Sequence, residues 1–253
     1  MTIRLSTGAR QGMGMSGGLA SMFNRGRIEI YTGSQPASAD NTAVGTLIGT
    51  VTQASGALTK ETRASGTVTI TAAAGGTINT ITVGGLNIIP DGAITAVVGD
   101  TAATAVLLNE AINRNGMMEA TVVGSVVTIR GRPGTGVSTA AISGSLTTVT
   151  ATYVNMGSLV AGVAPVNGLI FTCAAGVLSK VSDQIWSFNA LSTNTAGWFR
   201  IYSSDSADSG ASSTTFARID GSCAASGGDL NMNIGLVLGG PTTFDTLNIT
   251  IPA

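Results

Sequence analysis

Residues 192–253 form a succession of short runs in which apolar and small polar side chains alternate, separated by glycine, aspartate and serine. Alternation with a period of two is typical of half-buried strands, and the separating residues are typical of tight turns. No nucleophile–base pair or metal-ligand cluster interrupts the runs, so the segment is suited to packing rather than to a reaction. The runs cover residues 195–202, 216–222, 226–233 and 244–252.

The beginning of the chain has the same character. Residues 27–31 alternate strictly, with Ile28 and Ile30 on one face of the predicted strand. A polar turn follows, in which Pro36 disfavours a helix, and residues 45–52 return as a second strand.

The middle of the chain differs in composition, because Tyr153 is its one aromatic residue and alanine, glycine, threonine and valine dominate. We therefore predict a mainly β fold in which residues 27–55 and 166–253 form a jelly-roll-like β-sandwich. Residues 56–165 are predicted to be a separate domain inserted into it, since a surface loop tolerates such an insertion.

The inserted segment is predicted to be a small β-β-α-β-β module. Residues 101–113 have apolar side chains at helical spacing, and Asp100 or Thr101 can cap the start of this helix. A strand-like pair precedes the helix and another follows it, each predicted to be a hairpin. The pairs are residues 66–71 with 80–89, and residues 118–123 with 125–130.

Residues 1–26 are predicted to be an extended N-terminal arm that includes a short helix at residues 19–23. Four arginines precede the first acidic residue, so the arm could dock on an acidic partner surface. Deletion of residues 1–25 would then release the protein from its partner without unfolding it. The candidate docking residues are Arg4, Arg10, Arg25 and Arg27.

Charged residues make up only 10% of the chain, which suggests that neighbouring molecules cover much of its surface. The alternative is a β protein whose many threonine and serine hydroxyls suffice for hydration. Histidine is absent, which removes the commonest general base and metal ligand. Cys173 and Cys223 are predicted to be buried free thiols, with a disulfide within the C-terminal region or between subunits as the alternative.

Other functional classes find little support. The glycine-rich residues 12–18 lack the strand and the Gly-Lys-Ser/Thr ending of a phosphate-binding loop. The arm is too sparse in charge and aromatics for a nucleic-acid site, and no apolar run of 18 residues predicts a membrane span. We expect no catalytic, cofactor or metal site, and no enzymatic activity.

Glycan binding is a further possibility, since aromatic rings can stack on sugars. The candidates are Trp186, Trp198 and Tyr202. Phe199 follows Trp198 within a strand, so the two rings point to opposite faces and a core position is favoured for Trp198. Paired carboxylates could support glycoside hydrolysis, but Asp220 and Asp229 lie where turns are expected, and aspartate favours turns for backbone reasons. The pairs are Asp205 with Asp208, and Asp220 with Asp229.

Residues 27–50 and 196–231 resemble a family of tailed-bacteriophage virion proteins, and together cover roughly half of the chain. The middle, at residues 81–85, 102–113 and 120–129, is similar to a module of phage and flagellar surface proteins. The resemblance implies a non-enzymatic structural protein located in the virion and assembled in the host cytoplasm.

We therefore expect a homo-oligomeric capsid decoration (cement) protein whose partners are the major capsid protein or other virion proteins. The alternatives are a neck, collar or tail component, and a glycan-binding adhesin module that binds a host glycan.

Overall fold

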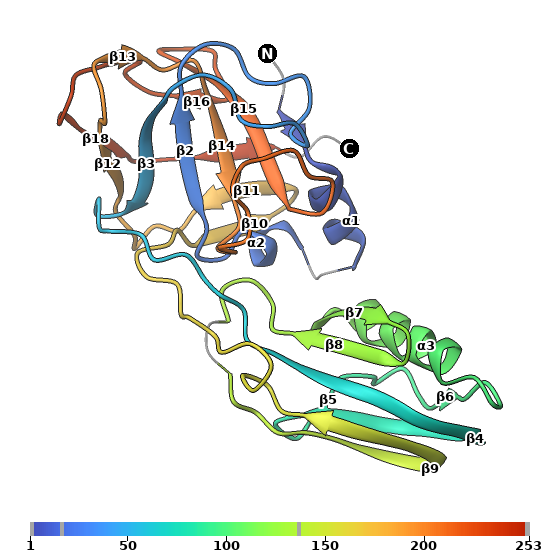
Figure 1. Ribbon diagram of the computed structural model, residues 1–253. Coiled ribbons are helices and arrows are strands. Elements are labelled where there is room, and N and C mark those ends of the chain that lie inside the picture. The colour runs from blue at the N-terminus through green and yellow to red at the C-terminus, as the bar shows by residue number, and fades with distance from the viewer. Residues whose placement is uncertain (1–2, 16–17, 136–137, 251–253) are drawn as a thin grey trace. The chain divides into compact units, whose positions relative to one another are not determined.

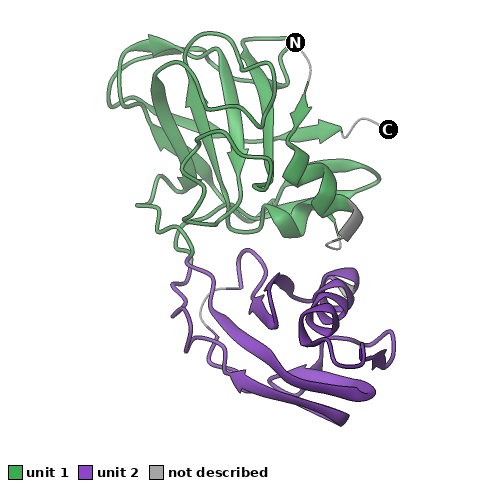
Figure 2. Cartoon of the chain, turned by 45° about the vertical axis from the view of Figure 1, so that its right-hand side comes forward, with its two compact units in different colours: residues 1–61, 165–253 green, residues 62–164 purple. Residues whose placement is uncertain are grey.

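The computed structural model describes residues 3–15, 18–135 and 138–250 (Figure 1). It is mainly β, with 44% of residues in strands and 10% in helices, and its several sheets are mostly antiparallel and none of them is closed. The chain divides into two compact units (Figure 2). Unit 1 contains residues 1–61 and 165–253, and unit 2 contains residues 62–164, close to the insertion of residues 56–165 that we predicted. No helix within the described ranges is long and apolar enough to cross a membrane.

Unit 1 is built on an eight-stranded sheet to which both ends of the chain contribute. Its central pair joins β2 from the start of the chain to β14 from the end, and β16 (Leu230–Asn231) pairs with β15 outside the main order. The main order is β1 (Arg4–Leu5), β15 (Arg218–Ala224), β14 (Trp198–Tyr202), β2 (Arg27–Tyr31), β3 (Leu47–Gln53), β12 (Trp186–Asn189) and β18 (Pro241–Phe244).

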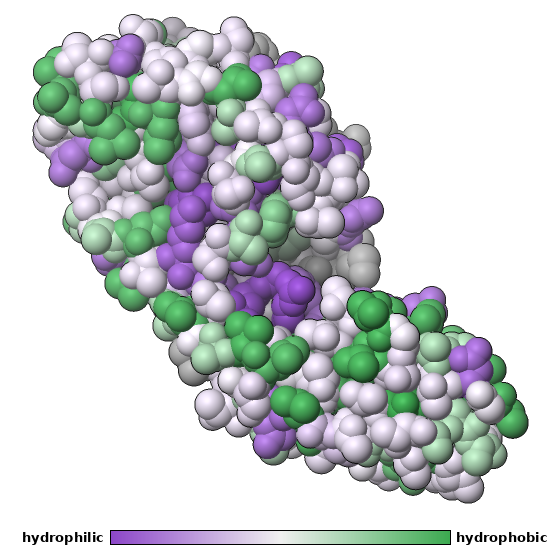
Figure 3. All heavy atoms as spheres, viewed as in Figure 1, coloured by the Kyte–Doolittle hydropathy of each residue, from purple (hydrophilic) through white to green (hydrophobic). Residues whose placement is uncertain are grey.

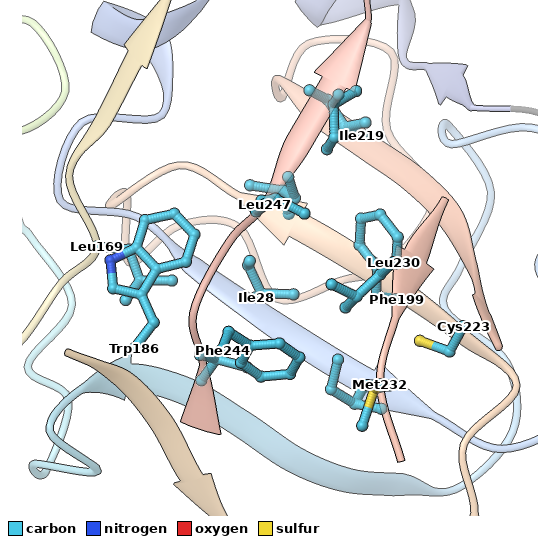
Figure 4. Close-up of a cluster of buried hydrophobic side chains, with 14 of the residues drawn as sticks. Ile28, Leu169, Trp186, Phe199, Ile219, Cys223, Leu230, Met232, Phe244 and Leu247 are labelled. Carbon is cyan, nitrogen blue, oxygen red and sulfur yellow. The ribbon is translucent and has the colours of Figure 1, made fainter. Parts of the chain in front are cut away.

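The hydrophobic core of unit 1 lies on one face of this sheet (Figure 4). Alternation places Ile28, Phe199 and Ile219 in the core from three adjacent strands. A three-stranded sheet and the short helix α2 (Leu19–Met22) also contribute side chains to it. The remaining strands of the unit are β10 (Phe171–Ala174), β11 (Val177–Lys180) and β19 (Asn248–Thr250), and the pair β13 (Asn194–Thr195) and β17 (Gly235–Leu236).

The prediction of an extended N-terminal arm is wrong for residues 3–15, whereas the short helix predicted at residues 19–23 is confirmed as α2. β1 is an edge strand of the large sheet, and α1 (Thr7–Met15) follows it directly. The Ser6 hydroxyl accepts hydrogen bonds from the amides of Ala9 (3.0 Å) and Arg218 (2.8 Å). Glycine allows close packing here, because a Cβ at Gly8 would lie 2.4 Å from the carbonyl oxygen of Thr215. Deletion of residues 1–25 would therefore remove part of unit 1.

Unit 2 has α3 (Thr101–Asn115) packed on one face of a six-stranded sheet. The predicted helix is confirmed: Asp100 caps its start by accepting a hydrogen bond from the amide of Ala103 (2.8 Å), and Gly116 ends it at φ 67°. The predicted hairpin after the helix is also confirmed, as β7 paired with β8. The strands are β4 (Ser65–Val83), β5 (Leu86–Asn87), β6 (Ile94–Thr95), β7 (Glu119–Val123), β8 (Val126–Arg130) and β9 (Ile142–Val154).

The predicted hairpin of residues 66–71 and 80–89 is wrong, because residues 66–71 and 80–83 belong to the single strand β4, and residues 84–89 turn back into β5. Gly75 and Gly76, each at φ 89°, do not turn the chain back. They lie where the register of β4 against β9 shifts, opposite Thr148 at φ 53°, and so form a bulge in one continuous pair of strands. The long partner strand β9 was not predicted.

The segments that lead into and out of the inserted unit run beside each other. Isolated antiparallel bridges join Thr59 to Val166 within unit 1, and Thr62 to Val163 within unit 2. Closely spaced ends are what an insertion requires if the host domain is to keep its own fold.

Candidate functional site

The face of the large sheet opposite the core carries charged and aromatic side chains. In β14, Phe199 and Ile201 enter the core, whereas Trp198, Arg200 and Tyr202 point to the other face. The antiparallel register sets Arg200 opposite Glu29 on one side and Asp220 on the other. We call this set the charged layer; it consists of Arg27, Glu29, Arg200, Asp208, Arg218 and Asp220, with Tyr31, Trp198 and Tyr202.

Two bidentate ion pairs dominate the charged layer. Arg200 donates from Nε and Nη2 to the two carboxylate oxygens of Asp220, at 2.6 and 2.7 Å. Arg218 binds Asp208 in the same way, at 2.9 and 2.5 Å. All four side chains are fully buried. A buried pair of this geometry stabilises the fold little compared with apolar residues, but the loss of one partner is costly.

Two loops cover the charged layer. Arg200 Nη1 donates to the carbonyl of Asn41 (2.9 Å) in residues 32–46, and Arg218 Nη2 donates to that of Ala211 (2.7 Å) in residues 203–217. The loops are also joined to each other, since the amide of Ala43 donates to the carbonyl of Gly210 (3.1 Å). The layer is therefore an interior surface of unit 1.

The candidate glycan-binding aromatics are all fully buried, so their rings are not available to stack on a sugar. Trp186 lies in the hydrophobic core, where its Nε1 donates to Gln184 (2.9 Å). Trp198 lies in the charged layer, stacked on Tyr31 with ring centroids 4.6 Å apart. Tyr202 lies beneath the guanidinium of Arg27, 4.1 Å from its ring centroid.

The aspartates that we considered as carboxylate pairs have structural roles. Asp205 and Asp208 accept hydrogen bonds from backbone amides two residues further on, as turn residues do. The placement of Asp220 in a turn is wrong, because it lies within β15 and pairs with Arg200. Asp229 accepts hydrogen bonds from the amide and the hydroxyl of Ser222, at 2.9 and 2.8 Å.

Beside the charged layer, the same face opens into a pocket of about 410 Å³ within unit 1. The pocket extends over β2, β3 and β12, and the loop of residues 54–60 closes one side. Its lining is mainly polar, and Arg27 and Glu29 are shared with the charged layer. The other lining residues are Thr50, Thr52, Ser55, Gly56, Leu58, Lys60, Phe188, Asn189 and Leu191.

Unlike the two bidentate pairs of the charged layer, the charged side chains at the pocket are not all paired. Glu29 is bound through one oxygen by Arg27 Nε (2.6 Å) and through the other by the Tyr31 hydroxyl. Burial, followed by the charge of Glu29, raises the pKa of Tyr31. Lys60 has no hydrogen-bond or ion-pair partner among the residues that the structure describes. Burial, followed by the charge of Arg27, lowers the pKa of Lys60.

The four candidate docking arginines have different environments. Arg10 and Arg25 are exposed, and Arg10 donates to the carbonyl of Leu5 (2.6 Å) within its own segment. Arg4 is half-buried and donates to the carbonyl of Pro36. Arg27 is only 2% exposed, so it is not part of a docking surface.

Both cysteines are free thiols, and the alternative of a disulfide between them is wrong for this structure. Cys223 is buried as predicted, whereas Cys173 is exposed in β10. Burial, with a smaller effect of Asp229, raises the pKa of the Cys223 thiol to about 12. A disulfide between subunits stays a prediction for Cys173.

Within the described ranges, no group of three or more cysteine, aspartate or glutamate side chains is placed to hold a metal ion.

Comparison of the chain with protein-family models, curated proteins and solved structures finds no match.

Proposed function

We propose that the protein is a non-enzymatic structural component of a bacteriophage virion, and specifically a capsid decoration protein bound in multiple copies. The observation that carries the proposal is an exterior poor in charge. Of the 25 charged residues in the chain, seven are buried, which leaves 18 to cover a surface of 10710 Å². The seven are Arg27, Glu61, Arg200, Asp205, Asp208, Arg218 and Asp220. A surface so poor in charge suits a molecule whose neighbours cover much of it.

An apolar patch at one end of unit 1 supports the same proposal. Leu191, Val237 and Leu238 are 57, 65 and 65% exposed, and hydrophobic side chains gather over the end of the unit near β12 and β13 (Figure 3). Their two loops are held together, since Gly239 N donates to the carbonyl of Ala190 (2.8 Å). A cluster of exposed aliphatic side chains marks an interaction surface better than scattered ones do. We call these three residues the apolar loop patch.

In unit 2, the edge strand β9 has only part of the usual protection, the bulge at Thr148. Among the described strands it pairs with β4 alone, and its 13 residues contain neither a charged residue nor a proline. Exposed edges normally carry such residues, because unpaired backbone groups invite pairing with another chain. Close packing of neighbouring copies on a particle would cover this edge.

Unit 1 is proposed to be a β-sandwich of the jelly-roll type. Support comes from its core, where side chains of the large sheet meet Leu178 and Ile249 of the β10–β11–β19 sheet. In the proposed function, unit 1 binds the particle and unit 2 projects from it. A modest interface repeated by symmetry then gives strong attachment through many copies.

The first test is the number of copies per purified particle, relative to the major capsid protein. A ratio close to that of the capsid lattice supports a decoration protein. Six or twelve copies would instead place the chain in the neck or tail, whose parts form rings of that symmetry. Absence from particles would refute the virion assignment.

A second test uses the apolar loop patch. The variant Leu191→Ser with Val237→Ser and Leu238→Ser is expected to lower the copy number without changing the melting temperature of unit 1. The matched control replaces Val98 and Val123 of unit 2, which are 76 and 82% exposed, by serine. Unchanged incorporation of the patch variant would refute the attachment through this surface.

A further inference from the structure

The pocket of unit 1 has a rigidly held wall. The loop that closes it begins with two non-glycine residues in the left-handed region, Ala54 at φ 51° and Ser55 at φ 54°. Hydrogen bonds hold both residues. The amide of Ala54 donates to the carbonyl of Ile185 (2.8 Å), and the Ser55 hydroxyl forms a hydrogen bond with the Ser187 hydroxyl (2.8 Å). Such a backbone persists only where its surroundings fix it, so the pocket is preformed.

Lys60 supplies the positive charge that is available to a ligand. Both oxygens of Glu29 are already bound, and the terminal nitrogens of Arg27 donate to the carbonyls of Ser203 (3.4 Å) and Asp208 (3.3 Å). Lys60 is half-buried and has no such partner within the described part of the chain. A bound anion would offset the loss of hydration and the repulsion by Arg27 that lower the pKa of Lys60.

The neutral part of the lining offers hydrogen bonds and aliphatic surface. The Thr50 hydroxyl and the Asn189 amide have no hydrogen-bond partner in the described ranges, and both line the pocket. Leu58 and Leu191 supply apolar contact. A ligand that matches these groups has a carboxylate, several hydroxyls and a C–H face, which together describe a sugar acid. A volume of about 410 Å³ lies in the range of small-molecule sites.

Two other anionic ligands fit less well. β3 pairs with β2 on one side and β12 pairs with β18 on the other, and the two strands are joined at Gln53–Trp186 and Thr52–Ser187, so an extended peptide could not pair along the whole of either strand here. A phosphate dianion is typically held by a free arginine fork or a nest of backbone amides. Arg27 is occupied, and the nearby carboxylates of Glu29 and Asp208 would repel a second negative charge.

We infer that this pocket binds a hexuronate residue of an acidic polysaccharide. Lys60 pairs with its carboxylate, and Thr50 and Asn189 bind its hydroxyls. Neither of the buried tryptophans lines this pocket, and its lining would bind the same ligand whether or not the protein belongs to a virion.

The chain has only two lysines, Lys60 and Lys180, which makes a direct assay possible. Reductive ¹³C-methylation keeps the charge and gives two dimethyl-lysine NMR signals, which the Lys60→Gln and Lys180→Gln variants assign. Trigalacturonate and triglucuronate are expected to shift the Lys60 signal and to raise the pKa of Lys60, while the Lys180 signal stays unchanged. The methyl ester of trigalacturonate, which keeps the rings but lacks the charge, is expected to bind about tenfold more weakly.

Calorimetry on the unmodified full chain gives the matched comparison. Lys60→Gln is expected to weaken binding of the better uronate about tenfold, and Lys180→Gln to leave it unchanged. Thr50→Val, which keeps the shape of the side chain, is expected to weaken both the acid and the ester. Melting temperatures identify any variant that fails to fold, and the ester comparison on the native chain then remains decisive.

Three outcomes would overturn the inference. The first is no response of Lys60 to either uronate. The second is an equal response to sodium acetate, which would indicate a site for any small anion. The third is tighter binding of triglutamate than of the uronates, which would assign the pocket to an acidic peptide.

Discussion

Replacement of Asp220 by alanine is expected to destabilise unit 1 severely. The change removes the carboxylate that receives two charge-assisted hydrogen bonds from Arg200, at 2.6 and 2.7 Å. Each such bond contributes about 1.5–3 kcal/mol. Arg200 is fully buried and keeps its bond to the carbonyl of Asn41 and its contacts with Trp198 and Tyr202, but it loses its carboxylate partner, so its charge is left uncompensated. We therefore expect a loss of about 3–5 kcal/mol, a large part of the stability of a typical domain.

The assay is urea unfolding followed by tryptophan fluorescence, which reports on unit 1 alone because Trp186 and Trp198 both belong to it. The matched control is Asp183→Ala, at an exposed aspartate of the same unit, with an expected change within about 0.5 kcal/mol. Replacing both Arg200 and Asp220 by leucine should cost less than Asp220→Ala alone, because neither member of this pair then leaves a buried charge without its partner. A loss below about 1 kcal/mol for Asp220→Ala would refute the reasoning.

Three further predictions concern reactivity, pH and the bulge in unit 2. At pH 8 a thiol reagent should modify Cys173 in the folded protein and reach Cys223 only after unfolding, because burial raises the pKa of Cys223 to about 12; two fast-reacting thiols would contradict this. Burial raises the pKa of Tyr31 and of Tyr202 above the unfolded value of 10.0, so their contribution is complete below pH 10 and is lost as the pH rises further. Urea unfolding at pH 8 and pH 11 should show a smaller alkaline loss for Tyr31→Phe than for the native chain, and an equal loss would refute the assignment. Gly76→Ala should destabilise unit 2 by about 1–3 kcal/mol, since Gly76 has φ 89° and a Cβ would meet the Thr148 hydroxyl; unchanged amide exchange in unit 2 would count against the bulge.

Sequence patterns predicted those elements whose signals are local. The helix of residues 101–115 has its own cap in Asp100 and its own stop in Gly116, so neighbouring segments need not be known. The insertion was detectable because aromatic residues disappear over a hundred consecutive positions, and the mainly β fold because alternation persists on both sides.

Elements that depend on distant partners were not predicted. β4 was divided in two because its two strand-like runs were paired with each other, and only the pairing with β9 shows that the chain continues between them through a bulge. The N-terminal segment was interpreted as an arm because its binding surface on β15 lies some 200 residues further along the chain. In each case the deciding contact is tertiary, and local propensity gives no indication of it.

The sequence predicted only part of the pocket and of the charged layer. Strict alternation in residues 27–31 placed Ile28 and Ile30 on one face, and therefore Arg27, Glu29 and Tyr31 on the other. Alternation does not reveal what covers the second face. A charged row is normally solvated, and here two loops bury it. Lys60 has no motif around it, so its position in the pocket could come only from the structure.

The chain has few charged residues, and it places seven of them in the interior and leaves its exterior largely uncharged. Arg200 binds a carboxylate through Nε and Nη2 and a loop carbonyl through Nη1, whereas Nη2 of Arg218 binds both a carboxylate and a loop carbonyl. The two side chains thus fasten residues 32–46 and 203–217 to the sheet. Apolar side chains could fill the same space with equal stability, but they would not select one position for each loop. The chain thus uses scarce charges to fix the shape of unit 1 from within. Its outer surface remains largely uncharged, and such a surface loses little hydration when a neighbouring molecule covers it.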